Sequence, residues 1–394
     1  MNVPEVVVDW RSKGFWLPEG KLDLPADLFG GQFTWPLLVL RRDAAEANIA
    51  TMAEYCRRHG WEFAPHAKTT MAPGLLARQM AAGAWGLTVA TANQALVLRR
   101  LGVPRVLIAN EVLDPTTLRW LAQENAAGWE VYFQVDSVAG ARIAASAGPL
   151  RVLIELGHDH GRTGVRTLDE LEEVARVVAE APGLELAGLT AYEGQLQYEP
   201  AVDDFLDRVV AGFQRLKGAG LLPDRPLLSA GGSAWFDRVV ERIAPVAADA
   251  TLVMRSGASV THDDGFYRER TPFLRVPQEG PLAAALDIWA QVISTPEPGL
   301  VLAGMGKRDA PFDEGLPVPM EIRRTDGTYA ATTGLEVTKL NDHHTYLSSG
   351  DLLLSPGDLI RFGISHPCTA FDKWRHIPVV DDDRRVVEVL ATYF

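Results

Sequence analysis

The chain has 394 residues, 47% of them hydrophobic, which is enough for a large core and two domains. Its formal net charge of −13 argues against a nucleic-acid partner, because phosphate backbones are bound by clustered Lys and Arg. Only two cysteines are present, no apolar run reaches membrane-spanning length and the N-terminus is not typical of a signal peptide, so we expect a cytoplasmic protein with no membrane partner and no disulfide framework.

Strand-like and helical runs alternate from about residue 37 onward. Strand-like runs cover residues 36–42, 61–68, 85–91, 105–112, 130–136, 151–157, 184–194, 226–232 and 251–258. Helical patterns lie between them, for example at 43–60, 167–183 and 202–220, and Thr167 with Glu170 forms a predicted capping box. This alternation predicts a parallel sheet with crossover helices, and the apolar strands indicate burial on both faces.

About eight such units fit an α/β class protein with a closed (β/α)8 TIM-like barrel over residues 43–270. An open doubly wound sheet is the alternative, although no G-x-G-x-x-G fingerprint follows an early strand. After about residue 270 the runs become short and are separated by Pro, Gly and Asp. This pattern predicts a C-terminal antiparallel β domain over residues 271–394.

A lysine stands at the end of the run "WEFAPHAK", just before a helix that Pro73 is predicted to open. Lys68, flanked by His66 and Thr69, therefore lies where such barrels place their chemistry. A lysine amine held among apolar groups has a lowered pKa and forms a Schiff base with a carbonyl, most commonly that of pyridoxal phosphate. The alternative is an ordinary solvated surface lysine.

Two glycine-containing loops follow the last two predicted barrel strands. They are "SAGGS" at 229–233 and "MRSGAS" at 254–259. A strand, two glycines, a serine and a helix N-terminus form a phosphate cradle, and barrels of this kind often bind phosphate between these two loops. The alternative is a tight turn that needs glycine for its backbone conformation.

Two further loops carry groups that suit a cofactor ring. In "GHDHGRTGV" (157–165), Arg162 can pair with an anionic group, whereas His158 and His160 read as exposed loop residues. In "AYEGQLQ" (191–197), Tyr192 can hydrogen-bond a ring nitrogen or hydroxyl.

The segment "HPCTAFDKW" (366–374) holds a histidine and a cysteine two positions apart. If it is extended, His366 and Cys368 point to the same face, and both are preferred ligands of Zn²⁺. "NDHH" at 341–344 either completes such a site or supplies a proton relay, with a plain polar turn as the alternative reading of Asn341 and His344.

Taken together, "PHAKT", "GRTGV", "AYEGQ", "AGGS", "RSGAS" and "HPC" resemble the fold-type III pyridoxal-phosphate enzymes with an alanine-racemase-like barrel. The similar branch is the metal-dependent D-serine dehydratase and D-threonine aldolase group. The resemblance implies that residues 1–42 join 271–394 in the β domain, with 36–42 crossing between the domains. It also implies a homodimer.

The resemblance also implies roles for single residues. Lys68 would carry the coenzyme, Arg162 and Tyr192 would flank its ring, and His366 and Cys368 would bind a divalent metal, Zn²⁺ before Mn²⁺ or Mg²⁺. The coenzyme phosphate would be held by Gly231, Gly232, Ser233, Arg255, Ser256 and Gly257. The proposed catalytic residues are Lys68, His66, Tyr192 and His344. The chain departs from the group at Ala258 and Ser259, where a tyrosine is common, and at "NDHH".

These implications predict a lyase for D-3-hydroxy amino acids. Dehydration to an oxo acid and ammonia is preferred over aldol cleavage to glycine and an aldehyde, because the resemblance implies that dehydratases pair His with Cys whereas aldolases carry His with Asp. The soft thiolate of Cys368 favours Zn²⁺. The alternatives are an amino-acid racemase, a non-catalytic pyridoxal-phosphate-binding homeostasis protein, and a glycosidase that would use Glu155, Asp159 or Glu193 near the strand ends.

Overall fold

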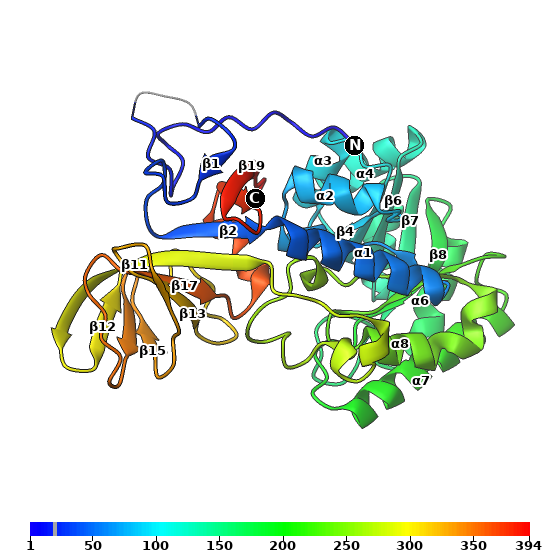
Figure 1. Cartoon of the computed structure of the whole chain (residues 1–394). Coiled ribbons are helices and arrows are strands. Elements are labelled where there is room, and N and C mark those ends of the chain that lie inside the picture. The colour runs from blue at the N-terminus through cyan, green and yellow to red at the C-terminus, as the bar shows by residue number, and fades with distance from the viewer. Residues whose placement is uncertain (19–21) are drawn as a thin grey trace.

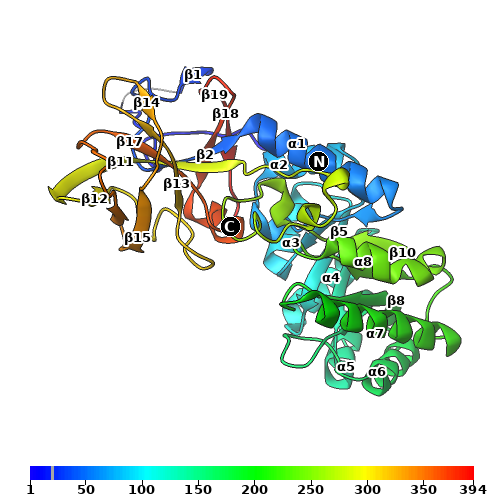
Figure 2. The same ribbon diagram turned by 60° about the horizontal axis from the view of Figure 1, so that its bottom comes forward.

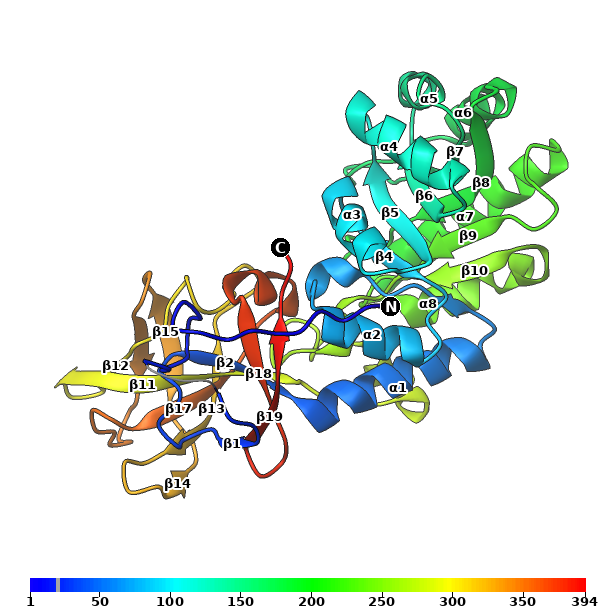
Figure 3. The ribbon, with the colours of Figure 1, turned by 90° about the horizontal axis from the view of Figure 1, so that it is seen from above.

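The computed structural model describes residues 1–18 and 22–394 (Figure 1). Two bodies lie side by side: a barrel of parallel strands covered by helices, and a domain built mainly from antiparallel strands. The amino-terminal segment contacts both, because the backbone N–H of Asn2 donates to the carbonyl of Leu101 (2.7 Å) before the chain enters the β domain (Figure 3).

Eight strands form the barrel, and each runs parallel to its neighbours in chain order. They are β3 (Glu62–Phe63), β4 (Leu87–Val89), β5 (Arg105–Glu111), β6 (Glu130–Val135), β7 (Leu150–Leu156), β8 (Leu184–Ala191), β9 (Leu227–Ala230) and β10 (Thr251–Met254). The last strand, β10, pairs with the first, β3.

The seam between β3 and β4 closes the barrel, although β3 has only two residues. The N–H of Trp85 donates to the carbonyl of Phe63 (2.8 Å), and the N–H of Thr88 donates to that of Pro65 (3.0 Å). A parallel bridge joins His66 to Thr88. The predicted closed barrel is therefore confirmed over the open sheet.

Eight α-helices lie outside the strands, as Figures 1 and 3 show. They are α1 (Arg42–Arg58), α2 (Pro73–Ala81), α3 (Ala92–Arg100), α4 (Pro115–Ala126), α5 (Val138–Ala145), α6 (Leu168–Glu180), α7 (Glu199–Gly218) and α8 (Phe236–Ile243). The predicted capping box starts α6: Thr167 Oγ1 accepts from the N–H of Glu170 (3.2 Å), whose carboxylate accepts from the N–H of Thr167 (2.9 Å).

The barrel interior changes from apolar to polar toward the carboxyl ends of the strands. An apolar layer is made by Ala64, Leu107, Leu153, Ala187, Leu227 and Val253. Because side chains on one face of a strand recur every second residue, Glu155, Ser229 and Arg255 follow directly above this layer. Thr190 and Gln134 complete the buried polar layer. The polar end of the barrel is thus prepared for a polar ligand.

The β domain contains an 11-stranded sheet. Its strands are β1 (Ala26–Asp27), β2 (Leu37–Arg41), β11 (Leu286–Glu297), β12 (Leu300–Ala303), β13 (Val318–Arg323), β14 (Tyr329–Ala330), β15 (Glu336–Leu340), β16 (Thr345–Ser348), β17 (Leu359–Gly363), β18 (His376–Val380) and β19 (Arg385–Ala391). Strand β2 lies between β11 and β18 and leads directly into α1 (Figure 2). No helix among residues 1–18 and 22–394 has the length and apolarity needed to span a membrane.

Substitution of Gly188 tests how closely strands β8 and β9 pack in the barrel. Gly188 in β8 has a φ of +151°, and an added Cβ would overlap the carbonyl oxygen of Leu227 in β9. We expect Gly188→Ala to lower the free energy of unfolding by about 3 kcal/mol. The matched control is Gly218→Ala at the end of α7, where an added Cβ meets nothing within 4 Å. It should raise stability by up to about 1 kcal/mol. Urea unfolding of both variants measures the difference, and equal effects would contradict the prediction.

Candidate active site

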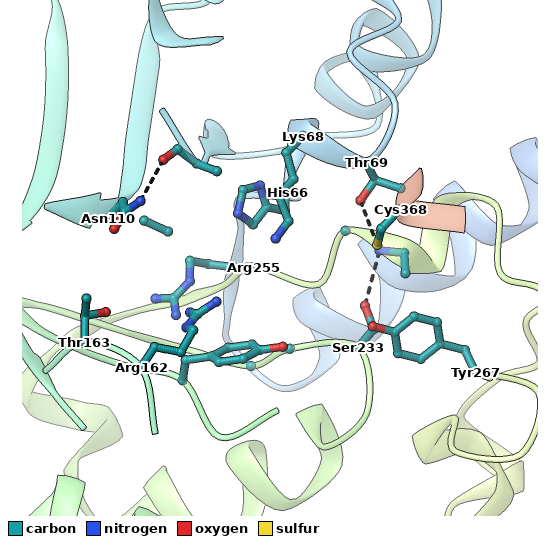
Figure 4. Close-up of a pocket in the computed structure, with 17 residues that line it drawn as sticks. His66, Lys68, Thr69, Asn110, Arg162, Thr163, Ser233, Arg255, Tyr267 and Cys368 are labelled. Atoms are coloured by element: carbon teal, nitrogen blue, oxygen red, sulfur yellow. Dashed lines mark hydrogen bonds between the residues drawn. The ribbon is translucent and has the colours of Figure 1, made fainter. Parts of the chain in front are cut away.

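A cavity of about 200 Å³ opens at the carboxyl ends of the barrel strands. It is lined by His66, Lys68, Thr69, Ala90, Ala109, Asn110, Arg162, Thr163, Tyr192, Gly231, Gly232, Ser233, Arg255, Gly257, Ala258, Tyr267 and Cys368. Most of these follow barrel strands, whereas Cys368 comes from the β domain. The structure therefore gathers ten of the residues singled out in the sequence around one space (Figure 4).

The amine of Lys68 reaches into this cavity between His66 and Cys368 (Figure 4). Lys68 stands in the short 3-10 helix η1 (Ala67–Thr69), which follows β3 and starts immediately after the barrel seam. Burial lowers the pKa of Lys68, and the nearby Arg162 and Arg255 lower it further, against an opposing effect of Cys368. The amine is therefore more readily available in its neutral, nucleophilic form than a surface lysine.

The imidazole of His66 is held neutral beside this amine. Burial lowers the pKa of His66 well below its ordinary value, and the positive charges of Lys68, Arg255 and Arg162 act in the same direction. Its Nδ1 is buried and has no hydrogen-bond partner among residues 1–18 and 22–394. A neutral ring with an unused nitrogen can accept a proton or a hydrogen bond from a ligand.

Arg255 is anchored across the ends of two strands. One guanidinium nitrogen, Nη1, donates to Thr190 Oγ1 (2.6 Å) and Ser229 Oγ (2.7 Å), and Nη2 donates to the carbonyl of Ala191 (2.7 Å). These bonds fix a buried cation at the floor of the cavity. The sequence placed Arg255 with the phosphate loops, whereas the structure holds its guanidinium in the polar layer of the barrel.

The expected phosphate cradle differs from the prediction in its backbone donors. The N–H groups of Gly231 (3.2 Å) and Gly232 (2.6 Å) donate to the buried carboxylate of Glu193, so they are already occupied. Helix α8 also begins only at Phe236, after the loop.

Ser233 and Ser256 carry the remaining polarity of this cradle. Ser233 Oγ lies 2.9 Å from Ser256 Oγ and accepts from the N–H of Ala258 (3.2 Å). The two loops thus meet through hydroxyl groups. Ser256 itself is buried beneath Ser233 and does not line the cavity.

Arg162 and Tyr192 form one wall of the cavity together. The guanidinium of Arg162 stacks over the ring of Tyr192, with 4.3 Å between Cζ and the ring centroid. Burial, followed by the charge of Glu193, raises the pKa of Tyr192, so its hydroxyl remains a hydrogen-bond donor.

The sequence suggested one extended segment for His366 and Cys368, and the structure differs from this expectation. His366 is extended, but Pro367–Thr369 form the 3-10 helix η6. The imidazole nevertheless interacts with the Cys368 thiol and with Asp313. Burial alone would lower the pKa of His366, yet these two partners raise it to about 9. Cys368 Sγ also lies 3.8 Å from Thr69 Oγ1, beside Lys68.

His344 lies apart from these residues, in the exposed turn between β15 and β16, where its carbonyl accepts from the N–H of Asn341 (2.8 Å). It does not line the cavity, so a catalytic role within one chain is not supported. Within the described parts of the chain, no three His, Cys, Asp or Glu side chains are grouped to hold a metal.

Four polar lining residues were not assigned from the sequence: Thr69, Asn110, Thr163 and Tyr267. Thr69 and Thr163 adjoin predicted site residues, and Asn110 ends a predicted strand. Tyr267 gave no such signal, because it stands in an irregular loop after β10. Its hydroxyl interacts with Ser233, and burial raises its pKa.

The glycosidase hypothesis is not supported. Glu155 and Glu193 are buried, Asp159 is exposed, and none of the three lines the cavity. The carboxylate of Glu193 is occupied by two backbone N–H groups.

Comparison with known families agrees with this geometry. Residues 40–246, more than half of the chain, match the family model "Alanine racemase, N-terminal domain". The chain belongs to this fold-type III pyridoxal-phosphate family. A second model, described as "Putative serine dehydratase domain", matches residues 285–380, which include His366 and Cys368.

The chain is similar to three proteins that are named as aldolases or dehydratases. A 3-hydroxy-D-aspartate aldolase of Paracoccus denitrificans is 27% identical over 87% of this chain and 88% of its own. A D-threo-3-hydroxyaspartate dehydratase of Delftia sp. is 30% identical over 56% and 62%. The crystal structure of a D-threonine aldolase from Filomicrobium marinum superposes with a TM-score of 0.79 at 26% identity, covering 94% of this chain and 97% of that one.

A carboxyl group at the rim of the barrel should make stability pH-dependent. Burial, and then the charges of Glu155 and Asp136, raise the pKa of Glu111 from 4.5 to about 7. The folded state therefore binds more protons than the unfolded state between these values, and stability falls as the pH rises from about 4.5 to about 7. Glu111→Gln should remove this loss.

The measurement is the melting temperature of both proteins below and above this pH range. Glu336→Gln, at an exposed position of β15, is the control and should keep the wild-type slope. A Glu111→Gln variant that still loses stability as steeply as the wild type would contradict the assignment.

Proposed function

We propose that this protein is a pyridoxal-phosphate-dependent lyase that acts on D-3-hydroxy amino acids, with dehydration as the preferred reaction. The observation that carries the proposal is the meeting of Lys68 and Cys368 in one cavity, one from the barrel and one from the β domain. The named relatives, two aldolases and a dehydratase of D-3-hydroxy amino acids, support the substrate class.

The chemistry of the cavity fits pyridoxal phosphate. Its lining provides the cations Lys68, Arg162 and Arg255 for an anionic ligand, and the hydroxyl of Ser233 for a phosphate oxygen. Lys68, whose pKa is lowered, is the amine that would hold the coenzyme aldehyde. When bound, the coenzyme supplies an electron sink for the negative charge that develops at Cα.

The residues of the chain divide the remaining work. Lys68 Nζ accepts the proton from Cα, for which a lowered pKa is suitable. His66, neutral and with a free Nδ1, is a candidate to pass protons to and from the substrate. Arg162 stacks on Tyr192, and together these side chains form a wall that orients the ligand. The buried cation of Arg255 stabilises negative charge at the floor of the cavity.

The donor set next to the cavity fits a divalent metal of the zinc type. An imidazole nitrogen and a thiolate sulfur are preferred zinc ligands. His366 and Cys368 would hold the ion. A bound Zn²⁺ would supply a Lewis acid that makes the 3-hydroxyl a better leaving group.

Dehydration is preferred because the sulfur ligand Cys368 stands where a carboxylate would suit a harder metal. Aldol cleavage is the second candidate, since the aldolase of Paracoccus denitrificans matches 87% of the chain and the dehydratase only 56%. A racemase needs no metal, and the barrel-only homeostasis proteins need no β domain. The homodimer stays a prediction.

The coenzyme site is tested by replacing its lysine. With pyridoxal phosphate and borohydride, the wild type should acquire a stable label on Lys68, whereas Lys68→Ala should lose both the label and the yellow colour. Its activity should fall by about 10²–10⁴-fold, because the proton acceptor at Cα is gone. Lys217→Ala, at an exposed site on α7, is the control and should be labelled as the wild type is. Labelling of Lys68→Ala at full yield would refute the assignment.

The reaction itself is decided by its products. D-Serine, D-threonine and D-3-hydroxyaspartate are incubated separately with the zinc-loaded holoenzyme. We expect a 2-oxo acid and ammonia in equal amounts, and loss of activity after chelation that added Zn²⁺ restores. Glycine and an aldehyde would establish the aldolase instead. Inversion at Cα without cleavage, unaffected by chelation, would establish a racemase.

A further inference from the structure

A single carboxylate holds both ends of the segment that carries the proposed metal ligands. Asp313 lies in the loop between β12 and β13, in the segment "APFDEGLP". Its Oδ2 is 2.8 Å from His366 Nδ1, and its Oδ1 accepts a hydrogen bond from Thr369 Oγ1 at 2.9 Å. These two partners precede and follow Cys368 in the chain, so the carboxylate bonds to the turn on both sides of the cysteine.

The bond to His366 determines which ring nitrogen is available. An imidazole whose Nδ1 faces a carboxylate keeps its proton there as the donor. The lone pair that can bind a metal is then left on Nε2. The neighbouring carboxylate also makes the imidazole a stronger base and hence a better ligand.

The surroundings of the ring restrict its rotation. The ring centroids of Phe266 and Tyr267 lie 5.7 and 5.8 Å from that of His366. The side chain of His366 is 13% exposed, whereas that of Asp313 is 40% exposed. The partly exposed carboxylate of Asp313 thus bonds to a largely enclosed ring that is packed beside two tilted aromatic rings.

We propose that Asp313 is a positioning residue for the metal: it selects the Nδ1–H tautomer of His366 and, through Thr369, fixes η6 so that the imidazole and the Cys368 thiolate bind one ion together. The inference rests on the proposed metal site and extends it to a residue that need not touch the metal or the substrate. Loss of such an outer partner weakens metal binding without removing a ligand.

Zinc affinity of the purified full-length protein tests this directly, by competition with a chromogenic chelator. Asp313→Ala should bind Zn²⁺ about 10–100-fold more weakly than the wild type. Asp313→Asn, which keeps an acceptor but not the charge, should fall between them, and Asp313→Glu should recover part of the affinity. Glu314→Gln, a neighbouring exposed carboxylate in the same loop, is the matched control and should bind as the wild type does.

The other readouts separate the possible outcomes. Melting temperatures without metal identify any variant that is merely unfolded, and Thr369→Val, which loses only the second hydrogen bond, then stands in as a milder variant with a smaller loss of affinity. If the wild type and His366→Ala bind zinc equally, the proposed metal site itself fails. If His366→Ala loses zinc while folded Asp313→Ala and Thr369→Val keep wild-type affinity, the metal site stands and the role of Asp313 is overturned.

Discussion

An excess of positive charge without a carboxylate to match it is the constraint on which this site depends. Lys68, Arg162 and Arg255 all line the cavity, and its described lining contains no Asp or Glu. Burial lowers the pKa of Arg255, and the carboxylates that oppose this shift, Glu193 and Glu155, lie outside the lining. An anion in the cavity relieves the repulsion among the cations. Burial lowers the pKa of Lys68, and the repulsion from Arg162 and Arg255 adds to this shift and so favours the reactive form of the amine.

The barrel supplies this arrangement through the period of its strands. One layer of apolar side chains fills the interior, and in three of its strands the residue two positions further along is polar, as at Glu155, Ser229 and Arg255. Thr190 and Ser229 accept hydrogen bonds from Arg255 in this buried layer. The seam between β3 and β4 has a corresponding role, because it fixes the backbone at His66 and so the direction from which Lys68 enters the cavity.

The second domain completes the cavity. Cys368 on η6 reaches Thr69 on η1, at 3.8 Å between Sγ and Oγ1, so the ligand segment of the β domain contacts the lysine segment of the barrel. The match to the alanine racemase model ends at residue 246, and the match to the serine dehydratase model begins at residue 285. The stretch between them contributes Arg255 and Tyr267 to the lining. Chemistry that needs both an amine and a metal thus depends on how the domains meet.

Local patterns in the sequence predicted the strands and the residues at their ends. Hydrogen bonds between residues far apart in the chain could not be predicted in this way. The alternation of runs predicted eight parallel strands, and strand ends located Lys68, Arg162 and Tyr192. The occupied N–H groups of Gly231 and Gly232 could not be foreseen, because Glu193 takes them only once β8 and β9 are paired. Asp313 is the extreme case: its partner His366 is 53 residues away, and nothing near "APFDEGLP" distinguishes it from a surface carboxylate. Candidate ligand residues such as His366 and Cys368 can be found from a sequence motif. A residue that orients such a ligand, such as Asp313, can be identified only from the three-dimensional structure.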